Sequence, residues 1–139
     1  MTEHISGTFD VTMGKKAMHD AASNSGIGRM SLDKRYHGGL DATGVGEMLA
    51  AMTAIPGSAG YVAMEFVEGS LGGRSGSFFL QHTGTMDRGT PTLSVVVVPD
   101  SGTDALVGLT GRLNIRLIAG EHSYDFDYSL APADGTLKA

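Results

Sequence analysis

Residues 61–84 read YVAMEFVEGSLGGRSGSFFLQHTG, in which Gly72-Gly73 separates two runs rich in β-branched and aromatic residues. Two adjacent glycines supply the positive φ values of a two-residue hairpin turn. With these glycines as the loop, Glu65 and His82 lie diagonally opposite each other on one face of the hairpin. Both faces also carry large apolar side chains, so we expect each to be covered. The residues alone do not decide which face is the lumen side of a barrel.

The rest of the chain repeats this pattern of alternating strands and short turns. A half-buried strand is predicted over 5–13, another over 29–37, and a hairpin around Ala119-Gly120. Residues Leu40–Ala54 are predicted as a strand of open register, with a helix over Gly46–Ala54 as the alternative.

Two segments are predicted to be irregular. Residues 14–28 lose the alternation and contain Asn, Ser and Gly, so we expect a surface loop with one helical turn at 16–21. Residues 132–139 are expected to form a tail.

These elements predict an all-β fold in a single domain spanning 1–139. The chain has about eight strands and no segment long enough for a helical crossover, so the sheet is expected to be antiparallel and mostly a meander. A closed barrel hides all the strand edges of such a sheet, and an open sandwich is the alternative.

The composition excludes several classes of function. The net charge of the 139 residues is -5, and no basic stripe suited to nucleic acid is present. The absence of cysteine excludes disulfides, thiolate zinc sites and cysteine nucleophiles. No apolar run is long enough for a membrane helix, and no signal-peptide pattern is present, so we expect a cytoplasmic protein without a membrane partner.

The candidate catalytic residues are Lys34, Glu65 and His82, each on a predicted face that is otherwise apolar. Glu47 joins them if strand 40–54 keeps a simple register with the preceding strand. A buried charge needs a partner, and a cation, a carboxylate and an imidazole can perform general acid–base chemistry together. The alternative is a structural network with no function beyond stability.

No metal or cofactor is expected. His37, His82 and His122 lack the spacing of a known metal motif. The glycine-rich stretches match no phosphate-binding loop, and no serine nucleophile motif occurs.

Several motifs carry a resemblance to a known family: GIGRMSLDK at 26–34, GSAGYVAMEFVEGSLGGRSGSFFLQHTGTM at 57–86 and VVPDSGTDALVGLTG at 97–111. From about Gly7 to Leu130 the chain resembles a family of small bacterial proteins known only as a domain of unknown function, with an allene oxide cyclase-like barrel. The segment Ser101–Gly108 also resembles the glycine-rich loop of allene oxide cyclases and dirigent barrels. The resemblance implies this fold, an interior cavity and self-association. The family's lysine, glutamate, glutamine and histidine correspond to Lys34, Glu65, Gln81 and His82.

The leading hypothesis is a barrel that binds a small, largely apolar or amphipathic ligand in its lumen, either as a binding protein or as a cofactor-free isomerase or cyclase. The predicted ligand-binding residues are Phe9, Glu47, Tyr61, Phe78, Leu80, Gln81 and Tyr124. The rival hypothesis is a non-catalytic assembly module that forms a homo-oligomer, with a dimer favoured. Its basis is the apolar face of Val62, Met64, Phe66 and Phe79, which lies opposite the predicted lumen and needs a cover.

Overall fold

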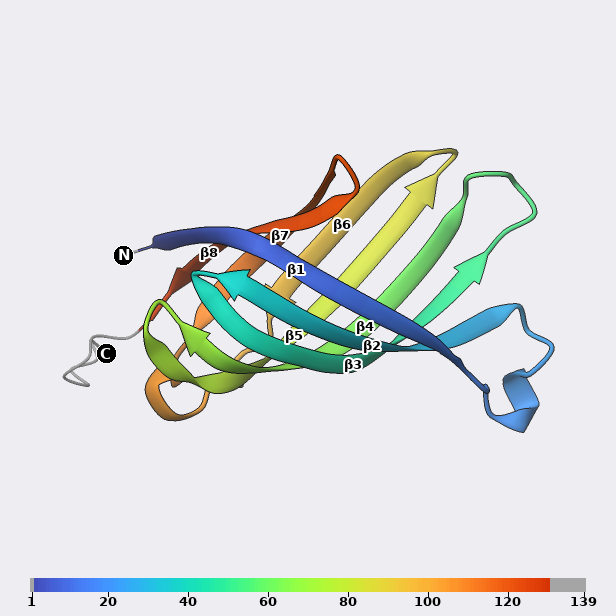
Figure 1. The fold of residues 1–139 in the computed structure, drawn as a ribbon. Coiled ribbons are helices and arrows are strands. Elements are labelled where there is room, and N and C mark those ends of the chain that lie inside the picture. The colour runs from blue at the N-terminus through green and yellow to red at the C-terminus, as the bar shows by residue number, and fades with distance from the viewer. Residues whose placement is uncertain (1, 131–139) are drawn as a thin grey trace.

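The computed structural model describes residues 2–130, which form one closed antiparallel barrel (Figure 1). Eight strands follow one another around the barrel in chain order, and the last pairs with the first. They are β1 (Glu3–Lys16), β2 (Ile27–Gly38), β3 (Leu40–Met52), β4 (Ala59–Leu71), β5 (Arg74–Asp87), β6 (Thr90–Val97), β7 (Thr110–Ile118) and β8 (Glu121–Ser129). The predicted barrel and its meander topology are confirmed.

The predicted register of the central hairpin is also confirmed. Leu71 pairs with Arg74 across the turn between β4 and β5, where Gly72 and Gly73 have φ of 56° and 87°. Both values lie in the left-handed region that glycine enters without steric cost. The turn therefore fixes which residues of β4 and β5 point into the barrel.

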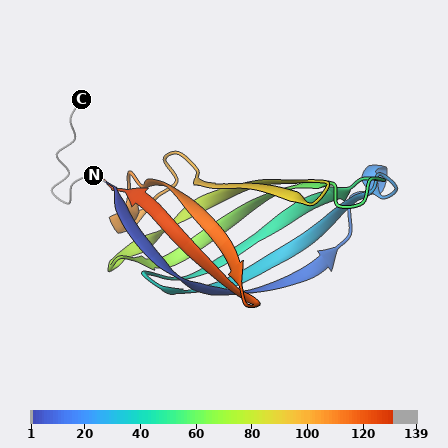
Figure 2. The same cartoon turned by 90° about the horizontal axis from the view of Figure 1, so that it is seen from above.

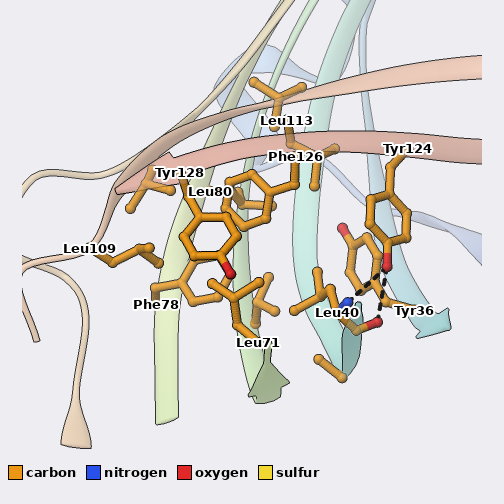
Figure 3. Packing of buried hydrophobic residues seen from close by; sticks show 14 of the residues in the cluster. Tyr36, Leu40, Leu71, Phe78, Leu80, Leu109, Leu113, Tyr124, Phe126 and Tyr128 are labelled. Atoms are coloured by element: carbon orange, nitrogen blue, oxygen red, sulfur yellow. Dashed lines mark hydrogen bonds between the residues drawn. The ribbon is translucent and has the colours of Figure 1, made fainter. Parts of the chain in front are cut away.

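Aromatic and leucine side chains fill one end of the barrel, called the packed end here (Figure 3). Phe78 stacks on Phe126 with ring centroids 6.0 Å apart. The hydroxyl of Tyr124 donates a hydrogen bond to the carbonyl of His37 at 2.8 Å and accepts one from the amide of Leu40 at 3.0 Å. These bonds tie β8 to the turn between β2 and β3.

The segment between β6 and β7 closes the packed end. Its 3-10 helix η2 (Asp104–Leu106) buries Leu106, and Leu109 is buried beside it. The amide of Thr103 donates to the carbonyl of Ser77 at 2.9 Å, so the segment continues along β5 after β6 ends. A single 3-10 turn thus lies between β6 and β7.

The opposite end, called the open end, lacks part of its wall because the β7–β8 hairpin is short. Figure 2 shows the β7–β8 hairpin ending well before β2 to β6 do. β8 pairs with β1 only from Glu3 to Phe9, whereas β1 pairs with β2 as far as Lys16. The wall between β1 and β6 is therefore incomplete at this end.

The predicted loop over 14–28 is wrong at both ends. β1 continues to Lys16 and β2 begins at Ile27, because residues 14–16 pair with 29–31 as strand ladder. Only 17–26 lie outside the strands, and they contain the 3-10 helix η1 (Asp20–Ala22). The helical alternative for Gly46–Ala54 is also excluded, since β3 runs to Met52. The predicted tail at 132–139 lies outside the described residues.

Candidate functional site

Lys34, Glu65 and His82 come together inside the barrel, halfway between its ends. They project inward from β2, β4 and β5, and their side chains are 6%, 0% and 4% exposed. The turn register predicted this convergence for Glu65 and His82. The face of the central hairpin that carries Glu65 is therefore the lumen face.

Gly44 of β3 allows Glu65 to reach β2. A Cβ atom at Gly44 would lie 2.1 Å from Oε2 of Glu65 and 3.2 Å from the ring of Tyr36. Because glycine leaves that space empty, the carboxylate passes over β3 and meets side chains two strands away.

Three donors satisfy the Glu65 carboxylate. Oε1 accepts hydrogen bonds from Nε2 of His82 at 2.8 Å and from Nζ of Lys34 at 3.2 Å. Oε2 accepts one from the hydroxyl of Tyr36 at 2.5 Å. Lys34 also lies over the ring of Phe9, with Nζ 4.9 Å from the ring centroid, a distance suited to a cation–π contact. We call Lys34, Tyr36, Glu65 and His82 the polar cluster.

These contacts keep the Glu65 carboxylate ionised. Burial acts to raise the pKa of Glu65, but the hydrogen bond from His82, the charge of Lys34 and the hydrogen bond from Tyr36 outweigh it, so the pKa lies below its ordinary value. For Tyr36, burial and then the charge of Glu65 raise the pKa well above its ordinary value. The site therefore contains a buried carboxylate and a protonated phenol.

Tyr36 is the member of the cluster that sequence reasoning missed as a functional candidate. It lies two residues after Lys34 on the same strand face, so the alternation placed it inside. Nothing in the sequence shows that Glu65 reaches it, because that contact depends on the gap left by Gly44.

Two predicted ligand-binding residues lie on the outer surface. Glu47 was expected beside Lys34, but Lys34 pairs with Gly44 and Ser31 with Glu47, so Glu47 points outward. The reason is the length of the turn between β2 and β3. A two-residue turn at 38–39 would pair His37 with Leu40, but the observed ladder is offset from this pairing by one residue. A one-residue offset moves every side chain of a strand to the opposite face of the sheet. Gln81 is exposed on the outer face because it precedes the inward-facing His82.

The other predicted ligand-binding residues point inward at two levels. Phe9, Phe78, Leu80 and Tyr124 are 4%, 1%, 0% and 0% exposed within the core cluster. They build the packed end and the floor beneath the polar cluster. Tyr61 lies at the open end, where its ring occupies the space above Gly84, and burial raises its pKa.

The open end is lined by flexible apolar side chains. Met13 and Leu93 point inward and are 50% and 39% exposed. Met30, Met48 and Tyr61 complete this lining and are half-buried. Inward-facing residues of a filled barrel would be buried, so these exposures show that solvent enters this end. Apart from the inward methionines, no sequence pattern indicates this opening.

The outer face of β3 to β5 carries a hollow of about 590 Å³, which also borders Ala63 and His82. Its walls include Arg29, Glu47, Leu49, Val62, Met64 and Gln81. Arg29 donates two hydrogen bonds to the carboxylate of Glu47, at 2.7 and 2.8 Å. It also donates one to the carbonyl of Ala17 at 3.0 Å. These bonds hold the β1–β2 loop beside the hollow. The hydrogen bond from Arg29 lowers the pKa of Glu47.

Across residues 2–130, no three histidines or carboxylates gather in a way that could hold a metal ion. No helix within the same range is long and apolar enough to cross a membrane.

Comparison with known proteins places the chain beside others of the same fold. A family model described as a protein of unknown function, DUF3224, matches residues 5–128. A crystal structure of a DUF3224 protein of unknown function from Shewanella oneidensis MR-1 is 46% identical, with a TM-score of 0.88. That similarity covers 95% of this chain and 99% of the other. No curated protein matches the chain.

Proposed function

Since the chain belongs to the DUF3224 family of proteins of unknown function, we propose its function from its own geometry: it binds a small, largely apolar molecule in the open end of the barrel. The apolar body of the molecule lies against the lining of the open end. Its polar end meets the polar cluster below.

One observation carries this proposal: apolar side chains on the inward face of the open end are half-exposed, and the buried polar cluster lies next to them toward the packed end. Met13 and Leu93 are 50% and 39% exposed although they face inward. His82, two residues before Gly84, the β5 partner of Leu93, is 3% exposed. Apolar walls with a few fixed polar groups are typical of small-molecule sites. Methionine adapts its shape to different ligands, which suits such a lining.

A narrower proposal concerns chemistry at the same site, a cofactor-free isomerisation or cyclisation. Glu65 orients the His82 imidazole, and an oriented imidazole transfers protons efficiently. The charge of Lys34 helps to keep Glu65 ionised, so the carboxylate continues to orient the imidazole. Proton NMR of a bound ligand before and after incubation tests this step, because isomers share one mass but differ in their spectra. An unchanged spectrum indicates that the protein only binds the ligand.

A pair of matched variants tests the binding site. Leu93→Trp enlarges an inward side chain that is 39% exposed, and Leu49→Trp enlarges an outward one that is 40% exposed. We expect Leu93→Trp to weaken, by at least about tenfold, the binding of ligands found by native mass spectrometry or thermal-shift screening, since it fills the site. Leu49→Trp serves as the control and should bind as wild type does. Equal effects of the two variants, or an effect of Leu49→Trp alone, would contradict the proposal.

The outer face supports a second candidate function, assembly into a homodimer. Val62, Met64 and Phe79 are 50%, 49% and 43% exposed on adjacent strands, and Phe79 packs against Phe66 with ring centroids 5.7 Å apart. A contiguous apolar face of this kind is typical of interaction surfaces. Sedimentation velocity at micromolar concentration tests this candidate, and a monomer removes it.

A further inference from the structure

The Glu65–His82 contact determines which imidazole nitrogen carries the proton. Nε2 of His82 lies 2.8 Å from Oε1 of Glu65, whose pKa is lowered, so the carboxylate is ionised and can only accept. Nε2 must therefore donate, and in the neutral ring the proton is on Nε2. Nδ1 then presents a lone pair.

Nδ1 of His82 has no protein partner among residues 2–130. Every fully buried side-chain nitrogen and oxygen in this range has a hydrogen-bond partner. Since Nδ1 lacks one, it is not among the fully buried atoms, although the residue is only 3% exposed. The side chain of His82 lies on the lumen face of β5, beside Glu65, so we assign the accessible side of Nδ1 to the lumen.

The donors of the polar cluster, by contrast, are already engaged. Nζ of Lys34 bonds to Oε1 of Glu65 at 3.2 Å and to the hydroxyl of Tyr36 at 3.4 Å, and it faces the Phe9 ring. The Tyr36 hydroxyl donates to Glu65. The group left for a ligand is the Nδ1 acceptor.

We propose that the ligand's polar end is a neutral hydrogen-bond donor, such as the hydroxyl of an alcohol, phenol or enol, which donates to Nδ1 of His82. This inference rests on the proposed binding function and names the class of ligand. A hydroxyl completes the hydrogen bonding of His82. An ether or a hydrocarbon leaves Nδ1 without a partner once water is displaced, and such a loss is costly in a buried site.

A carboxylate ligand is disfavoured for two reasons. Its oxygens accept hydrogen bonds and have no proton to give to Nδ1. Its charge also approaches that of Glu65, and like charges repel strongly where water is scarce. The charge of Lys34 does not offset this, because Glu65 already pairs with it.

Three probes with the same naphthalene body test the inference: 2-naphthol donates a hydrogen bond, 2-methoxynaphthalene lacks the donor, and 2-naphthoate carries a charge. Calorimetric titrations at mildly alkaline pH, where an ordinary imidazole is neutral, measure their affinities. We expect 2-naphthol to bind at least about tenfold more tightly than either of the others. The preference should disappear in His82→Leu and persist in Leu49→Trp.

Nitrogen-15 NMR of the wild-type His82 ring gives a second readout that needs no variant. We expect Nδ1 to be unprotonated in the free protein, and its signal to move with 2-naphthol but not with 2-methoxynaphthalene. A proton on Nδ1, equal affinity for the three probes, or tighter binding of 2-naphthoate overturns the inference while leaving the binding function in place. If none of the three binds, the proposed function fails, and the inference fails with it.

Discussion

Replacing Glu65 with Gln tests the electrostatic account of the polar cluster. Glutamine keeps the shape of the side chain and removes the negative charge that Lys34 and His82 share at 3.2 and 2.8 Å. Lys34, whose side chain is 6% exposed, then remains buried without a counter-charge. Breaking such a buried pair from one side costs about 3–5 kcal/mol.

The loss is large compared with the stability of a domain of this size, which is on the order of 5–15 kcal/mol. With a urea m-value of about 2 kcal/mol/M, the unfolding midpoint of Glu65→Gln falls by about 2 M. The double variant Lys34→Met with Glu65→Gln removes both charges, so we expect it to be at least ~1 kcal/mol more stable than the sum of the single effects.

The dependence on pH adds an independent check. Burial acts to raise the pKa of Glu65, but its three donors hold it below the ordinary value. The carboxylate therefore contributes stability that is present above its unfolded pKa, about 4.3, and is lost as pH falls through the lower folded pKa. The difference in the free energy of unfolding between wild type and Glu65→Gln should therefore become smaller over this acidic pH range.

Urea unfolding followed by circular dichroism over a series of pH values measures both effects. The reasoning is refuted if Glu65→Gln lowers the free energy of unfolding by less than ~1 kcal/mol, or if the effects of the two single variants add strictly. It is also refuted if the difference between wild type and Glu65→Gln does not change with pH.

Three further predictions concern the cluster and the outer face. Gly44→Ala places a Cβ atom 2.1 Å from Oε2 of Glu65, so we expect the free energy of unfolding in urea to fall by ~1–3 kcal/mol. The control is Gly28→Ala, whose Cβ atom would have no neighbour nearer than 4.0 Å. It should change the free energy of unfolding by less than ~0.5 kcal/mol. Burial and then the charge of Glu65 raise the pKa of Tyr36. The contribution of Tyr36 to the free energy of unfolding is therefore full below about pH 10 and is lost as pH rises through the folded pKa. Tyr36→Phe should reduce this loss of stability at alkaline pH, and an unchanged pH dependence would contradict the prediction. Val62→Asp should convert a wild-type dimer to a monomer in sedimentation velocity, and no change in mass would argue against the outer-face interface.

The sequence predicted those features of the barrel that local geometry determines. A two-residue turn at Gly72-Gly73 leaves one register for the central hairpin, and strand alternation then places Glu65 and His82 on the same side. Short turns and the absence of a helical crossover were enough to predict an antiparallel meander. Closure into a barrel followed from the need to pair the strand edges.

Features that depend on a single residue of offset, or on distant strands, were not predictable in this way. Glu47 moved to the outer face because the ladder between β2 and β3 is offset by one residue from the simple turn. The open end results from the length of the β7–β8 hairpin relative to strands far away in sequence. No local sequence pattern indicates that difference in length. The contact between Glu65 and Tyr36 was not predictable either, because it joins strands that are not neighbours and depends on the space left at Gly44.

The join between β6 and β7 has a consequence for how the barrel moves. Within the described residues, the ladder between these strands has one paired position, Val96 with Arg112, and the side chain of Arg112 adds a bond to Ser94 at 3.1 Å. Neighbouring strands that share so few backbone bonds separate at lower free energy than strands joined along their whole length. Amide protons along this seam should exchange with deuterium sooner than those between β3 and β4. Transient separation of β6 from β7 would allow a bulky ligand to enter the barrel between these two strands.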